Sequence, residues 1–201
     1  TAERFANGIH TGSPMRKNIF EGDKEEAKKH FKIDDRPTLL VFGGGSGSKI
    51  INENIRKAAF DLCKKFNILH VCGKGNAVDS NIYGYKQIEF VNDMGMAYAC
   101  ADAAVARCGS NSANELIALK IPTLFIPLQN SSSRGDQVVN AEYFKGMGLC
   151  RVLSEKELSP EILKNEVCVL FNDGKLKSAL AASTIECGNK NIIKEIKLSL
   201  R

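Results

Sequence analysis

Short apolar runs alternate with amphipathic stretches along most of the chain. Runs bounded by glycine, proline or polar residues predict strands, because strands buried on both faces read as continuous hydrophobic segments. These runs lie at residues 37–42, 68–72, 88–91, 103–106, 123–127 and 150–153. Apolar residues at helical spacing predict an amphipathic helix at 48–66. Further helices are predicted at residues 23–31, 93–101, 112–119, 137–147, 159–170, 174–183 and 190–200.

This repeated order of strand and helix, with short connections, predicts an α/β fold. The crossovers of such a fold are right-handed, and they build a doubly wound parallel sheet of the Rossmann-like type. We assign the sheet to residues 37–153, after an interdomain connection and a leading helix at 1–36 and before C-terminal helices at 154–201. Open α/β sheets bind ligands beyond the carboxyl ends of their strands, so the chemistry is expected in the strand-end loops.

Composition and charge exclude several classes of protein. The chain has 201 residues, of which 43% are hydrophobic and 25% charged, and these values exclude collagen-like and disordered chains. The net charge of +5 is spread out, as on a solubilising surface, although it could also attract phosphates or an anionic membrane. The basic residues are not clustered as in a nucleic-acid-binding arm, so no nucleic acid is expected as a partner. No apolar run reaches the roughly 18 residues of a membrane span.

The cysteines and histidines suggest neither a metal site nor a His-centred catalytic site. The 7 cysteines form no C-x-x-C pair and mostly sit in apolar runs, so we expect them to be reduced and buried. The 3 histidines are scattered along the chain. The first residue is Thr1 rather than methionine, which is expected of a processed chain or of a piece of a longer one.

A glycine-rich loop follows the first predicted strand and precedes a helix. Its sequence G-G-G-S-G-S (43–48) includes Gly44, Gly45 and Ser46. Glycines let the backbone approach an anion closely, and the helix N-terminus offers free N–H groups. The loop fits neither the Walker A nor the G-x-G-x-x-G pattern, and a plain tight turn is the alternative.

A second candidate loop, R-C-G-S-N-S-A-N-E (107–115), follows the predicted strand 103–106. Ser110, Asn111 and Ser112 can contact an anion where a helix begins. Glu115 has two readings of equal weight. It either completes an S-x-x-E capping box with Ser112 or accepts hydrogen bonds from ligand hydroxyls such as a ribose diol.

The remaining candidates lie in loops 90–94 and 129–137. Phe90 ends a predicted strand and could form the wall of a base pocket, although an aromatic residue there is more often part of the core. Asp136 and Gln137 end a long polar loop and can reach sugar hydroxyls, whereas a solvated loop capped by Asp136 is the alternative.

Taken together, the loops resemble one family, the MurG-type UDP-N-acetylglucosamine transferases. The matching segments occur in the order and spacing of the family. They are T-G-S-P-M-R (11–16), G-G-G-S-G-S-K-I-I-N (43–52), F-V-N-D-M (90–94), A-D-A-A-V-A-R-C-G-S-N-S-A-N-E (101–115), I-P-T-L-F-I-P-L (121–128) and S-R-G-D-Q-V-V-N-A (133–141). The resemblance covers residues 11 to about 153 and implies a GT-B architecture, in which two Rossmann-like domains face a cleft. The chain is similar to the C-terminal, donor-binding domain alone.

The resemblance also implies a role for each candidate residue. Arg16 is expected near the nucleotide or its pyrophosphate, and Gly44, Gly45 and Ser46 face the diphosphate. Phe90, Val91 and Met94 surround the uracil, while Ser110, Asn111 and Ser112 contact the diphosphate. Glu115 takes the ribose hydroxyls, and Asp136 and Gln137 contact the GlcNAc hydroxyls. The family loop usually reads G-G-S-x-G-[AS], so Gly45 stands where a serine is usual, and Ser46 is the substitute.

By the same resemblance, the activity is an inverting transfer of GlcNAc from UDP-GlcNAc to lipid-linked muramyl-pentapeptide, the step from lipid I to lipid II in peptidoglycan synthesis. No D-x-D metal site is visible, so neither a metal nor a cofactor is expected. The catalytic base is expected in an N-terminal domain outside this chain, which alone should be inactive. A lipid acceptor implies peripheral attachment to the cytoplasmic face of the membrane. The alternatives are a separate nucleotide-sugar-binding subunit of a split transferase, and half of a UDP-GlcNAc epimerase or hydrolase.

Overall fold

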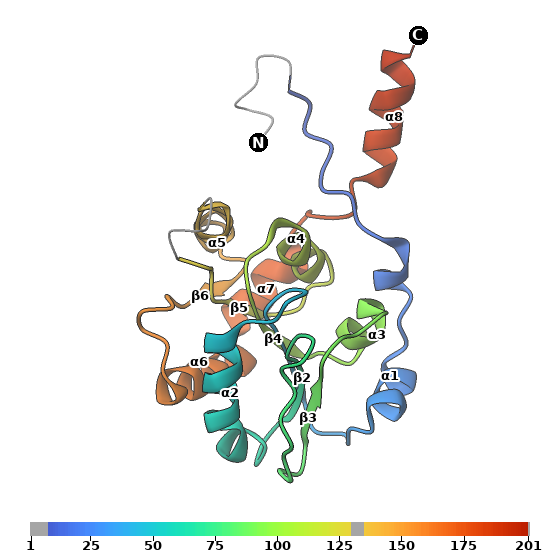
Figure 1. Cartoon of the computed structure of the whole chain (residues 1–201). Coiled ribbons are helices and arrows are strands. Elements are labelled where there is room, and N and C mark those ends of the chain that lie inside the picture. Colours follow the sequence, from blue (N-terminus) through green and yellow to red (C-terminus); the bar gives the residue numbers. More distant parts are fainter. Residues whose placement is uncertain (1–7, 130–134, 201) are drawn as a thin grey trace.

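The fold is built on a parallel sheet, as the hydrophobic pattern predicts. The computed structural model describes residues 8–129 and 135–200. Its 6-stranded sheet has the order β3-β2-β1-β4-β5-β6, and every pair of neighbours is parallel (Figure 1). The strands are β1 (Thr38–Phe42), β2 (Asn67–Val71), β3 (Tyr85–Ile88), β4 (Ala103–Ala106), β5 (Thr123–Phe125) and β6 (Arg151–Val152).

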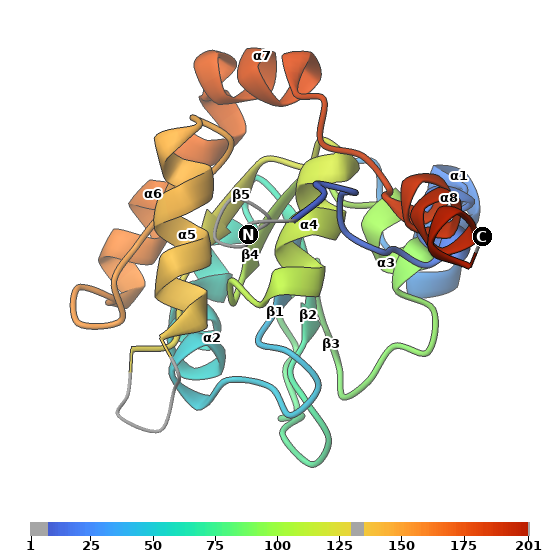
Figure 2. The same ribbon diagram turned by 90° about the horizontal axis from the view of Figure 1, so that it is seen from above.

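Helices cover both faces of this sheet. Helices α2 (Lys49–Leu62) and α6 (Pro160–Asn172) contact each other on one face, while α3 (Met94–Ala99) and α4 (Ser110–Ala118) lie on the other (Figure 2). α5 (Asp136–Gly146) packs beside α4 and β6. The elements outside the sheet region are η2 (Lys17–Phe20), α1 (Lys24–Phe31), α7 (Gly174–Ala182) and α8 (Asn189–Ser199).

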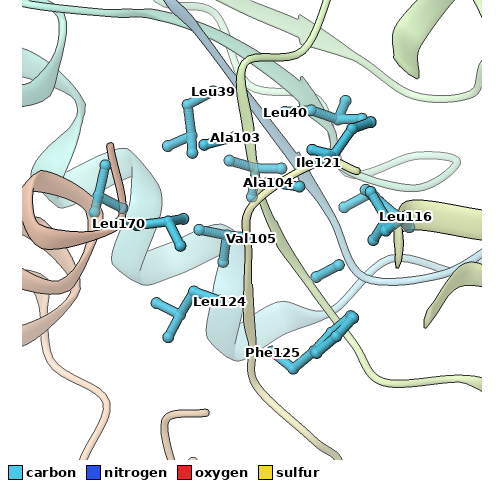
Figure 3. Packing of buried hydrophobic residues seen from close by; sticks show 14 of the residues in the cluster. Leu39, Leu40, Ala103, Ala104, Val105, Leu116, Ile121, Leu124, Phe125 and Leu170 are labelled. Carbon is cyan, nitrogen blue, oxygen red and sulfur yellow. The ribbon is translucent and has the colours of Figure 1, made fainter. Parts of the chain in front are cut away.

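The core lies on both sides of β1 and β4, whose residues are all buried. Successive side chains of a strand point to opposite faces, and Figure 3 shows this alternation. Leu39, Val105 and Leu124 point toward Leu170 of α6, whereas the neighbouring Leu40 points toward α4. The burial of whole strands explains why they read as unbroken apolar runs.

The third strand differs from its prediction. The apolar run 88–91 predicts a strand, but β3 is Tyr85–Ile88, which starts three residues earlier. β3 is an edge strand and pairs along β2 only as far as Val71, so residues after Ile88 have no further strand to pair with. They turn into a loop instead. The cysteine prediction is confirmed, because all 7 are free and most are buried.

The N-terminal segment and the start of α8 lie side by side. Asn189 binds both backbone groups of Met15: its Nδ2 donates to the Met15 carbonyl at 2.7 Å, and its Oδ1 accepts from the Met15 N–H at 3.1 Å. From this point α8 extends away from the body, and none of its described residues is buried (Figure 1). Within residues 8–129 and 135–200, no helix has the length and apolar character to cross a bilayer.

Two glycines bring the loops after β1 and β2 into contact. A Cβ atom on Gly47 would lie 2.0 Å from the Cys72 carbonyl oxygen, and the φ of Gly47 is +76°. A Cβ on Gly73 would lie 2.5 Å from the carbonyl oxygen of Ser46. The glycine-rich loop is therefore seated directly against the end of β2.

A buried polar chain supports the same junction. His70 of β2 lies between the hydroxyl of Tyr85, 2.8 Å from Nδ1, and the Oδ1 atom of Asn52, 2.9 Å from Nε2. Asn52 in turn donates from Nδ2 to the Cys72 carbonyl at 2.8 Å. Since Asn52 presents its oxygen to His70, Nε2 carries the ring proton and Nδ1 accepts from Tyr85. Burial, and then the charge of Arg56, lowers the pKa of His70 to about 3.

Gly47→Ala should destabilise the fold strongly. Both the left-handed backbone and the clash with Cys72 oppose a side chain at this position, so we expect a loss of roughly 2–4 kcal/mol in unfolding free energy. The matched control is Gly45→Ala, because a Cβ there meets nothing within 4 Å. Urea denaturation of the two variants measures the difference. Equal stability of both would contradict the seating of Gly47 against β2.

Stability should also fall in mild acid because of His70. Its pKa is lowered in the folded state, so the unfolded chain takes up a proton that the folded chain does not. Stability is then complete above about pH 6.5 and decreases as the pH falls toward 3, by up to about 1.4 kcal/mol per pH unit. Denaturation curves at several pH values between 7.5 and 5 measure this slope. In His70→Gln the slope should be shallower, and an unchanged slope would refute the assignment.

Candidate functional site

The site lies where the order of the strands reverses. The chain passes from β1 to β2 on one side, and returns to β4 on the other side of β1. A crevice opens at such a switch point, beyond the carboxyl ends of the strands. A pocket of about 640 Å³ occupies this position.

The pocket brings together most of the predicted site residues. Those that line it are Arg16, Gly44, Gly45, Phe90, Val91, Met94, Asn111, Ser112 and Glu115. They come from the N-terminal segment and from the ends of β1, β3 and β4, which are remote in sequence. The pocket is also lined by residues that the sequence reasoning missed, namely Pro14, Met15, Phe42, Val71, Asn92, Tyr98 and Asn189.

One wall of the pocket is apolar and partly open. Phe90 follows β3 and its side chain is 60% exposed, so it is not a core residue. Val91 and Met94 are half-buried beside it. Because β3 ends at Ile88, the chain is free to present these residues to the pocket. A flat aromatic side chain beside apolar groups suits the face of a heterocyclic base.

The floor holds a buried carboxylate. Glu115 is 8% exposed, and its Oε2 accepts a hydrogen bond of 2.8 Å from the hydroxyl of Tyr98, which joins α4 to α3. Burial, and then the charge of Glu115, raises the pKa of Tyr98, so the phenol stays protonated and remains a donor. The Tyr98 ring also packs edge-on against Phe42, with 6.2 Å between the ring centroids.

The capping-box reading of Glu115 is wrong. α4 begins at Ser110 with Gly109 as its N-cap, and no side chain caps it. Ser112 therefore lies inside the first turn, and Glu115 lies a turn further on, where its carboxylate meets Tyr98. α4 starts two residues before Ser112. Glycine is itself a favoured N-cap residue, so no polar side chain marks this start in the sequence.

A glycine-rich loop and a helix N-terminus form another part of the lining. Gly44 and Gly45 are exposed at the rim, where a Cβ atom on either would meet nothing within 4 Å. The uncapped N-terminus of α4 contributes Asn111 and Ser112. Free N–H groups and the positive end of a helix attract anions. Arg16 is exposed at the same pocket and adds a positive charge.

Other predicted residues stand apart from the described pocket lining. Ser46 and Ser110 are exposed beside it, and Asp136 is exposed at the first position of α5. Gln137 uses its Oε1 to accept from the Leu128 N–H at 3.0 Å, so it ties α5 to the end of β5. The preceding residues of the predicted loop, 130–134, lie outside the described residues.

The missed residues carry weak sequence signals. Tyr98 sits among small residues in a short helix, and nothing in its spacing points to Glu115, seventeen positions away. Asn189 reaches the pocket only because α8 starts beside Met15. Within the described parts of the chain, no group of three or more His, Cys, Asp and Glu residues is placed to hold a metal ion.

Known proteins resemble this chain over most of its length. A UDP-N-acetylglucosamine–N-acetylmuramyl-(pentapeptide) pyrophosphoryl-undecaprenol N-acetylglucosamine transferase of Clostridium novyi is 39% identical over 192 residues, which are 92% of this chain and 54% of that protein. The transferase of the same name from Clostridium botulinum strain Langeland is 42% identical, over 94% of this chain and 55% of that protein. The chain thus spans about half the length of these curated relatives.

Solved structures share the fold. The crystal structure of Acinetobacter baumannii MurG superposes with a TM-score of 0.70 at 22% identity, and the match covers 96% of this chain and 58% of that one. The glycosyltransferase of kitacinnamycin superposes with a TM-score of 0.68 at 19% identity, over 86% of this chain and 43% of that one.

The predicted fold class is therefore confirmed as that of the C-terminal half of a GT-B glycosyltransferase. Residues 38–196, from β1 into α8, match the sequence profile of the glycosyltransferase family 28 C-terminal domain. The chain belongs to this family.

Proposed function

We propose that the chain is the UDP-GlcNAc-binding domain of a transferase that acts on lipid-linked muramyl-pentapeptide in peptidoglycan synthesis. The observation that carries this proposal is the composition of one pocket. It combines an exposed aromatic wall at Phe90, a buried carboxylate at Glu115, and a glycine-rich rim beside a helix N-terminus. An aromatic face suits a base, a buried carboxylate suits ribose hydroxyls, and free N–H groups at a helix N-terminus suit a diphosphate. The names of the Clostridium relatives supply the sugar and the acceptor.

In the proposed reaction, this chain stabilises the departing UDP. When the acceptor hydroxyl displaces the diphosphate, negative charge grows on the phosphate oxygens. The glycine loop, the N-terminus of α4 and Arg16 line the same pocket, and their backbone N–H groups and guanidinium are the donors that we assign to this charge. We propose that this suffices without a metal ion or a cofactor. The GlcNAc hydroxyls are assigned to Asp136 and Gln137, which begin the neighbouring helix α5.

The acceptor and the catalytic base are assigned to another domain. The relatives are about twice as long as this chain, which leaves room for a second domain. A lipid acceptor would bring the enzyme to the cytoplasmic face of the membrane as a peripheral protein. The isolated chain should accordingly bind the donor and transfer nothing.

Calorimetric titration with UDP, UMP and UDP-GlcNAc tests the donor site. The chain should bind all of them. Phe90→Ala should weaken the binding of UDP by about 1–2 kcal/mol, because base stacking on an aromatic ring contributes about that much. Tyr83→Ala is the matched control, since Tyr83 is another exposed aromatic residue outside the described pocket lining. No binding of any uridine nucleotide would overturn the proposal. Transfer to lipid-linked acceptor by the isolated chain would refute a separate acceptor domain. Turnover of UDP-GlcNAc without acceptor by the full-length protein would favour an epimerase or hydrolase.

The ribose assignment predicts a dependence on the sugar hydroxyls. Glu115→Ala should weaken the binding of UDP by roughly 1–3 kcal/mol, because the ribose hydroxyls lose a buried acceptor. Tyr98→Phe should weaken it by roughly 0.5–1.5 kcal/mol. Titration with 2′,3′-dideoxy-UDP is the control, since this ligand lacks both hydroxyls and should bind wild type and Glu115→Ala almost equally. If UDP affinity is unchanged while the melting temperature falls, Glu115 is structural only.

A further inference from the structure

A buried arginine joins the loops on the far side of the glycine-rich rim. Arg107 directly follows β4 and is 8% exposed. Its Nη1 donates to the Ile126 carbonyl at 2.9 Å, and its Nη2 donates to Ser48 Oγ at 2.8 Å. The same Nη2 forms an ion pair with Glu155 Oε1 at 2.5 Å.

The partners of Arg107 belong to different strand-end connections. Ser48 ends the glycine-rich loop after β1 and is the N-cap of α2. Ile126 follows β5, and Glu155 follows β6. The second oxygen of Glu155 accepts from the Gln129 N–H at 3.2 Å, so the connection from β5 to α5 is held at this point too. One guanidinium thus sets the spacing of the carboxyl ends of β1, β4, β5 and β6.

Arginine is the side chain that can make this set of hydrogen bonds. Burying a charged group is unfavourable unless it is paired and hydrogen-bonded, and here every partner is an oxygen in a different direction. The planar guanidinium presents several donors in a rigid fork, whereas a lysine ammonium is a single point on a flexible stem. A lysine can keep the pair with Glu155, but it cannot also hold Ser48 and Ile126 in the same geometry.

We propose that Arg107 is a positioning residue for the diphosphate and sugar end of the donor site. The inference rests on the proposed function. Arg107 is absent from the described pocket lining, so it acts through Ser48, which carries the glycine-rich loop, and through Ile126 and Glu155, which carry the connection to α5. The base and ribose end, with Phe90 and Glu115, makes no hydrogen bond to Arg107 among the described contacts.

The test compares ligands that reach different distances into the site. Calorimetry measures Kd of UMP, UDP and UDP-GlcNAc for wild type and Arg107→Lys, well below the melting temperature of each. A displaced loop should raise the Kd of UDP and of UDP-GlcNAc about tenfold, while the Kd of UMP changes less than about threefold. Arg151→Lys is the matched control. Arg151 of β6 is also paired with carboxylates, but these are Glu166 of α6 and Asp173 between α6 and α7. Its substitution should leave the ratio of the UDP and UMP dissociation constants unchanged.

A second variant keeps the test decisive if Arg107→Lys does not fold. Glu155→Gln retains the size and one acceptor of the carboxylate, and should show the same preference for losing UDP over UMP, to a smaller extent. A UDP-to-UMP ratio equal to that of wild type in a folded Arg107 or Glu155 variant overturns the positioning role, while the proposed function stands. Failure of the wild-type chain to bind any uridine nucleotide overturns both.

Discussion

The burial of β1 between two parallel neighbours is the constraint on which the pocket depends. All five residues of this strand are buried, and their backbone groups pair with β2 on one side and β4 on the other. Both faces of such a strand must be covered, and the crossover connections between parallel strands cover them with helices. The chain therefore crosses over on opposite faces of the sheet, and the loops after β1 and β4 must face each other across a crevice.

Buried polar groups then determine how those loops sit. An apolar core holds strands but does not specify loop geometry, because apolar contact has no direction. His70, Asn52, Arg107 and Glu115 are all buried, and each has hydrogen-bond partners on another element. A group of this kind is costly to leave unpaired, so each bond fixes the relative position of the two segments that it joins. The fold thus buries polar groups near the edge of the sheet that carries the described pocket.

The sequence predicted the elements that depend on local pattern and missed those that depend on pairing. β1, β2 and β4 read as apolar runs because both of their faces are covered. β3 was misplaced because its first residues, Tyr85, Lys86 and Gln87, include polar side chains that an edge strand can leave exposed. The start of α4 was misplaced because Gly109 caps it without a side chain.

The site divides in the same way. Positions in or just after the strand-end loops, such as Gly44, Phe90 and Glu115, could be selected from sequence, because strand ends converge in any parallel sheet. The contacts between particular side chains could not be predicted from the sequence. Tyr98 reaches Glu115 only because α3 and α4 lie on the same face, and Arg107 reaches Ser48 only because β4 lies beside β1. These contacts come from the order of the strands, and no short-range spacing encodes that order.

The described pocket lining provides hydrogen-bond donors for an anion but no group suited to act as a general base. Deprotonating an acceptor hydroxyl needs a group whose pKa lies near the working pH and which faces the reacting atoms. Glu115 is held by Tyr98. His70 has both ring nitrogens bonded and a pKa lowered to about 3, so it stays neutral inside the sheet. Under the proposed function, the described lining offers the leaving diphosphate hydrogen-bond donors in the glycine loop and in α4, together with the positive charge of Arg16. Such donors stabilise the charge that develops on a leaving group, but they do not remove the proton from an attacking hydroxyl. Under the proposed function, this domain holds the donor substrate and stabilises its leaving group, and the group that activates the acceptor comes from the second domain that we propose.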